Sequence, residues 1–205
     1  MVASSWDDSR RAFADGAAWL VELAGQVGDR WDAPGLGEWD LRALVGQASR
    51  SLLTVETYLA RPAPDAEVPS AEAYYTAIQT LTTGPAVTQR GRDAGAALGD
   101  DPAAAVGVVA ARVVPLVQRA DGSELLTTLA GGMRLRDYLP TRVLELAVHG
   151  ADIAVALGLA PDVPASTGAG ALALVAALAA AQGRSGPLLL ATTGRRGLPP
   201  GFSVL

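Results

Sequence analysis

Apolar side chains recur every three to four residues along most of the chain, which is the period of an α-helix. Glycine and proline clusters interrupt this pattern. It predicts helices at residues 5–27, 41–59, 71–81, 86–98, 102–119, 141–158 and 168–182. Asp40 is expected to cap the second of these helices, and residues 61–70, with three prolines, to form an extended loop. Together with the high alanine content, these segments predict a mainly all-α fold.

Two regions lack the helical period. Residues 124–129 and 133–135 flank Gly131-Gly132 and predict a short β-hairpin. The hairpin leads to Asp137, a predicted cap for the helix that follows, with Pro140 in its first turn. Residues 188–193 and 202–205 predict two short strands in a small C-terminal α/β tail. We therefore expect a helical bundle at residues 1–160, and at 161–205 a helix with a two-stranded annex, either packed on the bundle or the remnant of a second domain.

The predicted helix at residues 141–158 holds the single histidine of the chain within its most consistently apolar pattern. Glu145, His149 and Asp152 follow one another at i, i+4 and i+7, so they share an arc of about 60° on the helix surface. Arg142 lies beside that arc. Two interpretations stay open: a narrow solvent-exposed stripe with local ion pairs, or a polar seam that faces a cleft. In a cleft, a glutamate and a histidine at this spacing can both reach one cation.

Composition narrows the candidate functions. The chain has 16 basic residues, all arginines, against 21 acidic residues, for a net charge of −5, and it has no cysteine. Such sparse basic residues do not indicate nucleic-acid binding. Without cysteine, any thiol chemistry must come from a substrate or cofactor. The first residues lack the apolar core of a secretory signal, and the longest apolar run, 168–181, is shorter than the ~20 residues that span a membrane. We expect a cytoplasmic protein that binds neither nucleic acid nor membrane.

Two motifs carry a resemblance to a known family. The first is a Trp-x-[VL]-R-x-L pattern at the start of a predicted helix, matched by Trp39, Leu41, Arg42 and Leu44. The second is an E-x-x-x-H-G-x-D segment, matched by Glu145, His149, Gly150 and Asp152. In these motifs and the helices around them, residues 5–160 resemble the DinB-like superfamily, in particular the mycothiol-dependent maleylpyruvate isomerase family of actinobacteria.

The resemblance implies a DinB-like four-helix bundle in which a His–Glu–His set holds a divalent metal, usually zinc. It also implies a low-molecular-weight thiol such as mycothiol as cofactor. Glu145 and His149 would be two of the metal ligands, with Asp152 and Arg142 in the layer of residues around them. The position of the remaining histidine holds Gln47, and a carboxamide is a weaker zinc ligand than an imidazole. The third ligand is therefore expected to be weak or lost.

Three functional interpretations stay open. The first is a thiol-dependent metalloenzyme of the isomerase or transferase kind that acts on a small-molecule substrate. The second is a catalytically silent helical bundle that binds a small ligand in the same cleft. The third is a purely structural protein or one that forms a homodimer. Retention of Glu145 with His149 favours the first interpretation, whereas Gln47 favours the second.

Overall fold

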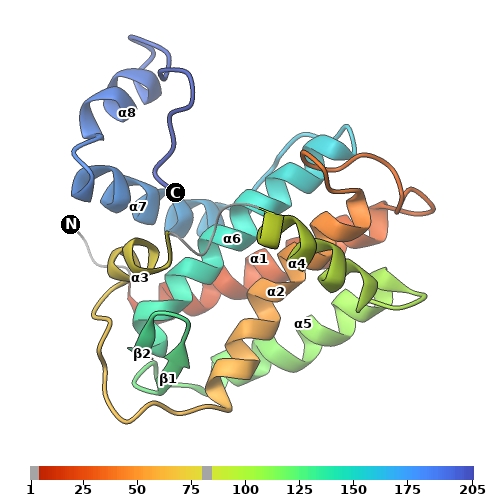
Figure 1. Cartoon of the computed structure of the whole chain (residues 1–205), viewed down its shortest axis with the longest axis horizontal. Coiled ribbons are helices and arrows are strands. Elements are labelled where there is room, and N and C mark those ends of the chain that lie inside the picture. Colours follow the sequence, from red (N-terminus) through yellow and green to blue (C-terminus); the bar gives the residue numbers. More distant parts are fainter. Residues whose placement is uncertain (1–4, 80–84) are drawn as a thin grey trace.

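The computed structural model describes residues 5–79 and 85–205, in which eight helices and one antiparallel hairpin are present (Figure 1). The elements are α1 (Trp6–Gln26), α2 (Leu41–Leu59), α3 (Ala71–Ile78), α4 (Pro85–Ala96), α5 (Pro102–Arg119), β1 (Leu125–Thr128), β2 (Gly131–Arg134), α6 (Leu135–Ala156), α7 (Ala165–Ala181) and α8 (Ser185–Thr192). The predicted mainly helical fold with a short hairpin is confirmed. Residues 80 and 81 of the helix predicted at 71–81 lie outside the described residues.

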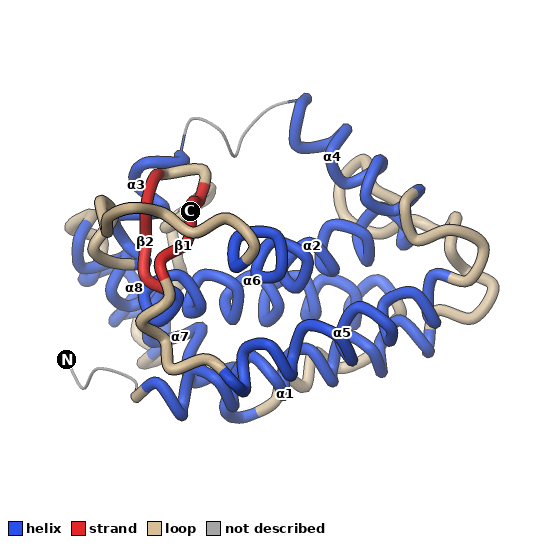
Figure 2. Tube along the Cα trace, turned by 90° about the horizontal axis from the view of Figure 1, so that it is seen from below, coloured by secondary structure: helices blue, strands red, loops and turns tan. Residues whose placement is uncertain are grey.

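Four long helices pack in the cyclic order α1–α5–α2–α6 and enclose most of the core (Figure 2). Each presents an apolar face to its neighbours, and Phe13, Leu52, Val113 and Leu146 are at most 1% exposed. Their starts follow the local sequence, as at α2, where the predicted cap is confirmed: the Asp40 carboxylate accepts a hydrogen bond from the Ala43 N–H at 2.7 Å. α4 covers α2, and α3 covers α6.

α6 is the central helix, because it packs against α1, α2, α3 and α7. The prediction that Asp137 caps the start of α6 is wrong. The helix begins at Leu135 with no side-chain cap, and Pro140 lies inside it rather than in its first turn. The segment before the hairpin replaces the cap, because the Leu135 N–H donates to the Glu124 carbonyl at 2.8 Å. Backbone groups brought back by the hairpin thus satisfy the helix start.

The hairpin lies at one end of the bundle with the proline-rich loop 61–70 beside it (Figure 1). Its strands pair antiparallel from Leu125↔Arg134 to Thr128↔Gly131. The loop joins this pair through backbone bonds, since the Glu67 and Val68 N–H groups both donate to the Gly132 carbonyl. The predicted loop and hairpin are both confirmed.

The C-terminal tail differs from the prediction of two strands. Residues 188–192 belong to helix α8, and residues 202–205 form no strand. Leucine and alanine are strong helix formers, and the described strands β1 and β2 pair with each other and, through isolated bridges, with the loop 61–70. α8 has no buried residue. Among the described elements, α7 is the one with which α8 makes substantial contact (Figure 1). Residues 185–192 of the tail are therefore helical, and residues 193–205 form turns and coil.

α5 is the one described helix long and apolar enough to cross a membrane by length and composition. Val106, Val113 and Val117 on one of its faces are fully buried against the bundle, where α5 packs on α1 and α2. One third of the helix is buried, in a stripe that faces α1 and α2, which is the pattern of an amphipathic helix on the outside of a bundle.

Candidate functional site

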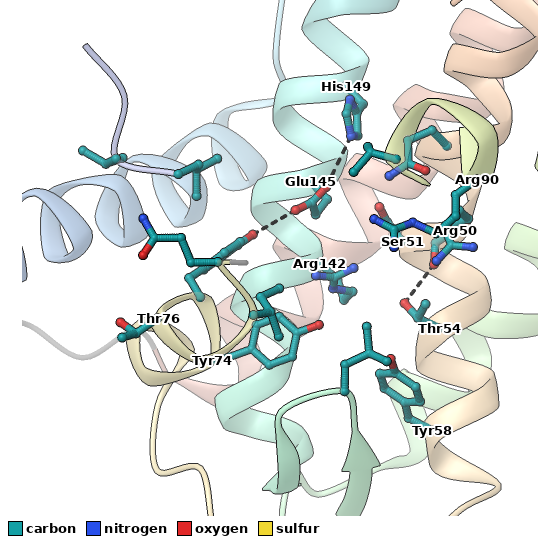
Figure 3. A pocket seen from close by; sticks show the side chains of 18 of the residues that line it. Arg50, Ser51, Thr54, Tyr58, Tyr74, Thr76, Arg90, Arg142, Glu145 and His149 are labelled. Carbon is teal, nitrogen blue, oxygen red and sulfur yellow. Dashed lines mark hydrogen bonds and ion pairs between the residues drawn. The ribbon is translucent and has the colours of Figure 1, made fainter. Parts of the chain in front are cut away.

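A cavity of 720 Å³ opens between α2, α3, α4 and α6, with the last residues of the chain at its rim. Four of the predicted site residues line it: Gln47 from α2, and Arg142, Glu145 and His149 from α6. Figure 3 shows Arg142, Glu145 and His149 one above another along α6, facing the α2 side chains. Asp152 is not part of the lining and lies one turn beyond His149. The predicted polar seam therefore faces a cavity rather than open solvent.

Glu145, His149 and Asp152 form a row of charges that we call the acid–imidazole centre. The His149 Nε2 lies 3.3 Å from the Glu145 Oε2, and the Nδ1 lies 3.4 Å from the Asp152 Oδ2. The His149 side chain is only 13% exposed. Burial by itself lowers the pKa of His149, but its contacts with Asp152 and Glu145 outweigh burial and raise the pKa to about 9. In this arrangement the imidazole is positively charged near neutral pH.

Tyr75 of α3 fixes the other side of Glu145. Its hydroxyl donates to the Glu145 Oε1 at 3.0 Å. Burial, followed by the nearby Glu145 charge, holds the pKa of Tyr75 well above its ordinary value, so the hydroxyl stays protonated and donates. For Glu145, burial raises the pKa, but the contacts with His149, Arg142 and Tyr75 outweigh burial and lower it to about 2. Glu145 is therefore an ionised carboxylate with both oxygens engaged.

The two sequence motifs have physical roles at this site. The Trp39 ring meets the His149 ring edge-on, with centroids 6.3 Å apart, and its Nε1 donates to the Thr88 carbonyl at 2.9 Å. Trp39 therefore joins α4 to the imidazole. Position 150 is a glycine because the Trp19 ring packs against the helix there. A Cβ at this position would lie 2.3 Å from a Trp19 ring carbon.

Gln47 faces the same cavity, and its Oε1 is buried without a hydrogen-bond partner. An orphaned buried carbonyl oxygen is costly and commonly marks a missing ligand or water. Two ligands of one tetrahedral zinc ion, each about 2.1 Å from it, lie about 3.4 Å apart, close to the separation of the Glu145 and His149 donors. The Glu145 and His149 donors are therefore spaced for one divalent cation, and Gln47, which lines the same cavity, is the candidate for a third, neutral donor. Within residues 5–79 and 85–205 no group of three or more His, Asp or Glu side chains is arranged to hold a metal, so this fit depends on Gln47.

Arg142 differs from the acid–imidazole centre in having no acidic partner. The residue is 8% exposed, and its Nε donates to the Thr141 Oγ1 at 3.0 Å. Its guanidinium lies 5.0 Å from the Tyr138 ring centroid and 5.9 Å from that of Tyr74. Among the described residues no carboxylate lies within 4 Å of its nitrogens. The two terminal nitrogens are left as hydrogen-bond donors at the cavity wall.

The sequence did not single out two further residues of the site, Tyr75 and Arg50. Arg50 follows Gln47 by three residues on α2, so helical spacing could have placed it on the same face. Nothing local in the sequence indicates that Tyr75 reaches Glu145, because α3 and α6 are separated by more than 50 residues. Comparisons with protein-family models, curated proteins and solved structures find no match.

Proposed function

We propose that this chain is a DinB-like helical bundle that acts as a metal- and thiol-dependent isomerase or transferase on a small molecule bound between α2 and α6. One observation carries the proposal: Glu145 and His149, with donors 3.3 Å apart, share a 720 Å³ cavity with the orphaned Gln47 carbonyl. A cavity of this volume is in the range for small-molecule sites.

Each residue of the site has a role in this proposal. Glu145, His149 and Gln47 would hold the cation once the His149 imidazole has released its proton, and the cation would supply Lewis acidity and lower the pKa of a thiol or water. Asp152 lies 3.4 Å from the His149 Nδ1 as an ion-pair partner, and Tyr75 fixes the Glu145 carboxylate. Trp39 shields one side of the imidazole from water. The remaining cavity is open to substrate and thiol.

The second candidate function is a catalytically silent bundle that binds a small ligand in the same cavity. The observation in its favour is Gln47, whose amide oxygen is a poor zinc ligand in a chain with a single histidine. In addition, the His149 imidazole is already paired with carboxylates on both sides. In this case the acid–imidazole centre shapes the cavity without holding a metal.

Zinc titration of metal-free protein tests the proposal, with Gln47→His as the informative variant. The wild-type protein should bind zinc weakly, and an imidazole at position 47 should tighten binding at least about tenfold. The melting temperature should rise on zinc addition, because the metal binds the folded state. His149→Ala in the Gln47→His background is the control and should abolish the gain. Unchanged affinity in Gln47→His would refute a metal site here.

A thiol assay separates the two candidates. Zinc-loaded wild-type protein, given mycothiol and an activated alkene, should accelerate thiol addition or isomerisation, and Glu145→Gln should remove the acceleration. No acceleration by a protein that binds zinc would leave the silent bundle as the function.

A further inference from the structure

The charges of the chain are divided unequally between the bundle and the C-terminal region. Residues 163–205 hold three of the 16 arginines, Arg184, Arg195 and Arg196, and none of the 21 acidic residues, for a net charge of +3. Residues 1–162 hold the other 13 arginines and all 21 acidic residues, for a net charge of −8. An acidic protein thus has one cationic region, which can orient it toward an anionic partner.

α8 exposes leucines within this cationic region. None of its residues is buried, and Leu189 and Leu190 are 62% and 40% exposed. Leu198, in the segment that follows, is 46% exposed. Figure 1 shows α8 standing away from α1, α2 and α5. These leucines contribute little to the packing of the bundle, so covering them with an apolar partner would be favourable.

The end of α8 brings two of the arginines beside the leucines. Gly194 has a φ of +71°, which glycine adopts without strain, and turns the chain back. The N–H groups of Arg195 and Arg196 then donate to the Leu190 carbonyl at 2.9 and 3.1 Å. Both arginines are exposed, and neither side chain makes an ion pair or hydrogen bond with a described residue. Cationic and apolar groups therefore occur together, at what we call the α8 tip: Leu189, Leu190, Arg195, Arg196 and Leu198.

This combination fits the surface of a membrane that contains anionic lipid. Leucines can enter the boundary between headgroups and acyl chains, while guanidinium groups bind lipid phosphates. We propose that the α8 tip binds anionic lipid surfaces, with the bundle facing the solvent. The sequence-based expectation of no membrane partner rested on the lack of an apolar run of ~20 residues, which surface binding does not require.

Charge also favours lipid over a second copy of the chain as the partner. A symmetric dimer through the α8 tip would bring Arg195 and Arg196 of both copies together, and like charges repel. The bundle, with its charge of −8, is repelled by anionic lipid, but salt screens charges that lie farther away than about 8 Å. With so few arginines and leucines in contact, the binding should be reversible.

Sedimentation of the untagged full chain with lipid vesicles tests the proposal. Vesicles of phosphatidylcholine with about one third phosphatidylglycerol should bind the protein, and pure phosphatidylcholine vesicles should bind it at least about tenfold more weakly. Raising the salt from about 0.05 M to about 0.5 M should release the protein from the anionic vesicles. Equal binding to both kinds of vesicle, or no binding to either, would overturn the proposal.

Two double variants locate the site. Arg195→Gln/Arg196→Gln removes charge from the α8 tip, and Leu189→Ser/Leu190→Ser removes apolar surface. Each should weaken binding to anionic vesicles at least about tenfold. All four residues are exposed, so both variants should keep the melting temperature of the wild-type protein. Wild-type affinity for anionic vesicles in both variants would refute the proposal.

Matched controls lie on the bundle. Arg119→Gln/Arg134→Gln changes the net charge by the same amount at two exposed arginines, and Leu36→Ser/Val108→Ser removes two exposed apolar side chains. Both controls should bind anionic vesicles like the wild-type protein. If Arg119→Gln/Arg134→Gln weakens binding as much as the arginine variant of the tip, net charge rather than the α8 tip is responsible, and the proposal fails.

Sedimentation velocity without lipid tests the other occupant. The wild-type protein should be a monomer in this measurement. A dimer that dissociates in Leu189→Ser/Leu190→Ser would show that a second copy covers the leucines, and would overturn the proposal. Vesicle binding uses neither metal nor thiol, so its outcome is independent of the proposed function.

Discussion

The acid–imidazole centre and Arg142 lie on the same helix, within three turns of each other, and differ in how their charges are satisfied. Glu145 and Asp152 flank His149 at 3.3 Å and 3.4 Å, so the positive charge of the imidazole is balanced locally. Arg142 is more deeply buried, yet no described carboxylate lies within 4 Å of it. The first group contributes to folding by its own pairs. The second has no described carboxylate in contact and interacts with the Glu145 charge only at longer range.

The spacing of the residues explains this difference. Side chains at i, i+3 and i+4 meet on one helix, so Glu145, His149 and Asp152 pair without help from any other element. Arg142 is three residues before Glu145, but Tyr75 and His149 already engage both carboxylate oxygens. Removing a partner from the first group should therefore destabilise the protein, whereas removing the charge of the second should not.

The largest expected effect is that of Glu145→Leu. This change leaves the His149 imidazolium with one partner and the buried Tyr75 hydroxyl without its carboxylate. We expect a loss of about 3 kcal/mol in the free energy of unfolding, measured by urea denaturation at pH 7 in EDTA. Tyr75→Phe is the matched partial variant and should cost about 1 kcal/mol. A loss below about 1 kcal/mol for Glu145→Leu would show that the pairs contribute little to stability.

A second, smaller effect is expected from pH. The pKa of His149 is raised from 6.5 to about 9 in the folded protein, so protonation stabilises the fold. This contribution is fully present below pH 6.5 and is lost as the pH rises through about 9. Between pH 6 and pH 9.5, in EDTA, we expect the free energy of unfolding of the wild-type protein to fall by about 2 kcal/mol more than that of His149→Gln. Parallel pH profiles of the two proteins would mean that the imidazole is not held as a cation.

The smallest effect, and opposite in sign, is that of Arg142→Met. Methionine fills a similar volume between Tyr138 and Tyr74 without a buried charge, so the variant should be more stable by about 1 kcal/mol. Urea denaturation of both proteins in ligand-free buffer measures this change. If Arg142→Met is instead destabilised, the tyrosine rings suffice to hold the guanidinium, and the contrast between the two groups disappears.

Local sequence determined most of the secondary structure. The helices at α1, α2, α5 and α7 follow from apolar spacing and local capping, as with Asp40, and the hairpin follows from Gly131-Gly132. The start of α6 and the form of the tail were not predictable in this way. The first depends on the carbonyls of residues 122 and 124, and the second depends on the packing of α8 against α7.

The same division holds for the candidate site. The pairing of Glu145, His149 and Asp152 follows from the sequence, because helical spacing alone brings these side chains together. The packing of α2 against α6 decided that Gln47 and Arg50 face them, and the packing of α3 decided that Tyr75 binds Glu145. Sequence also could not show that Arg142 is buried without an acidic partner. Whether a charge is paired across helices depends on contacts between residues far apart in the chain, and only the tertiary structure sets those contacts.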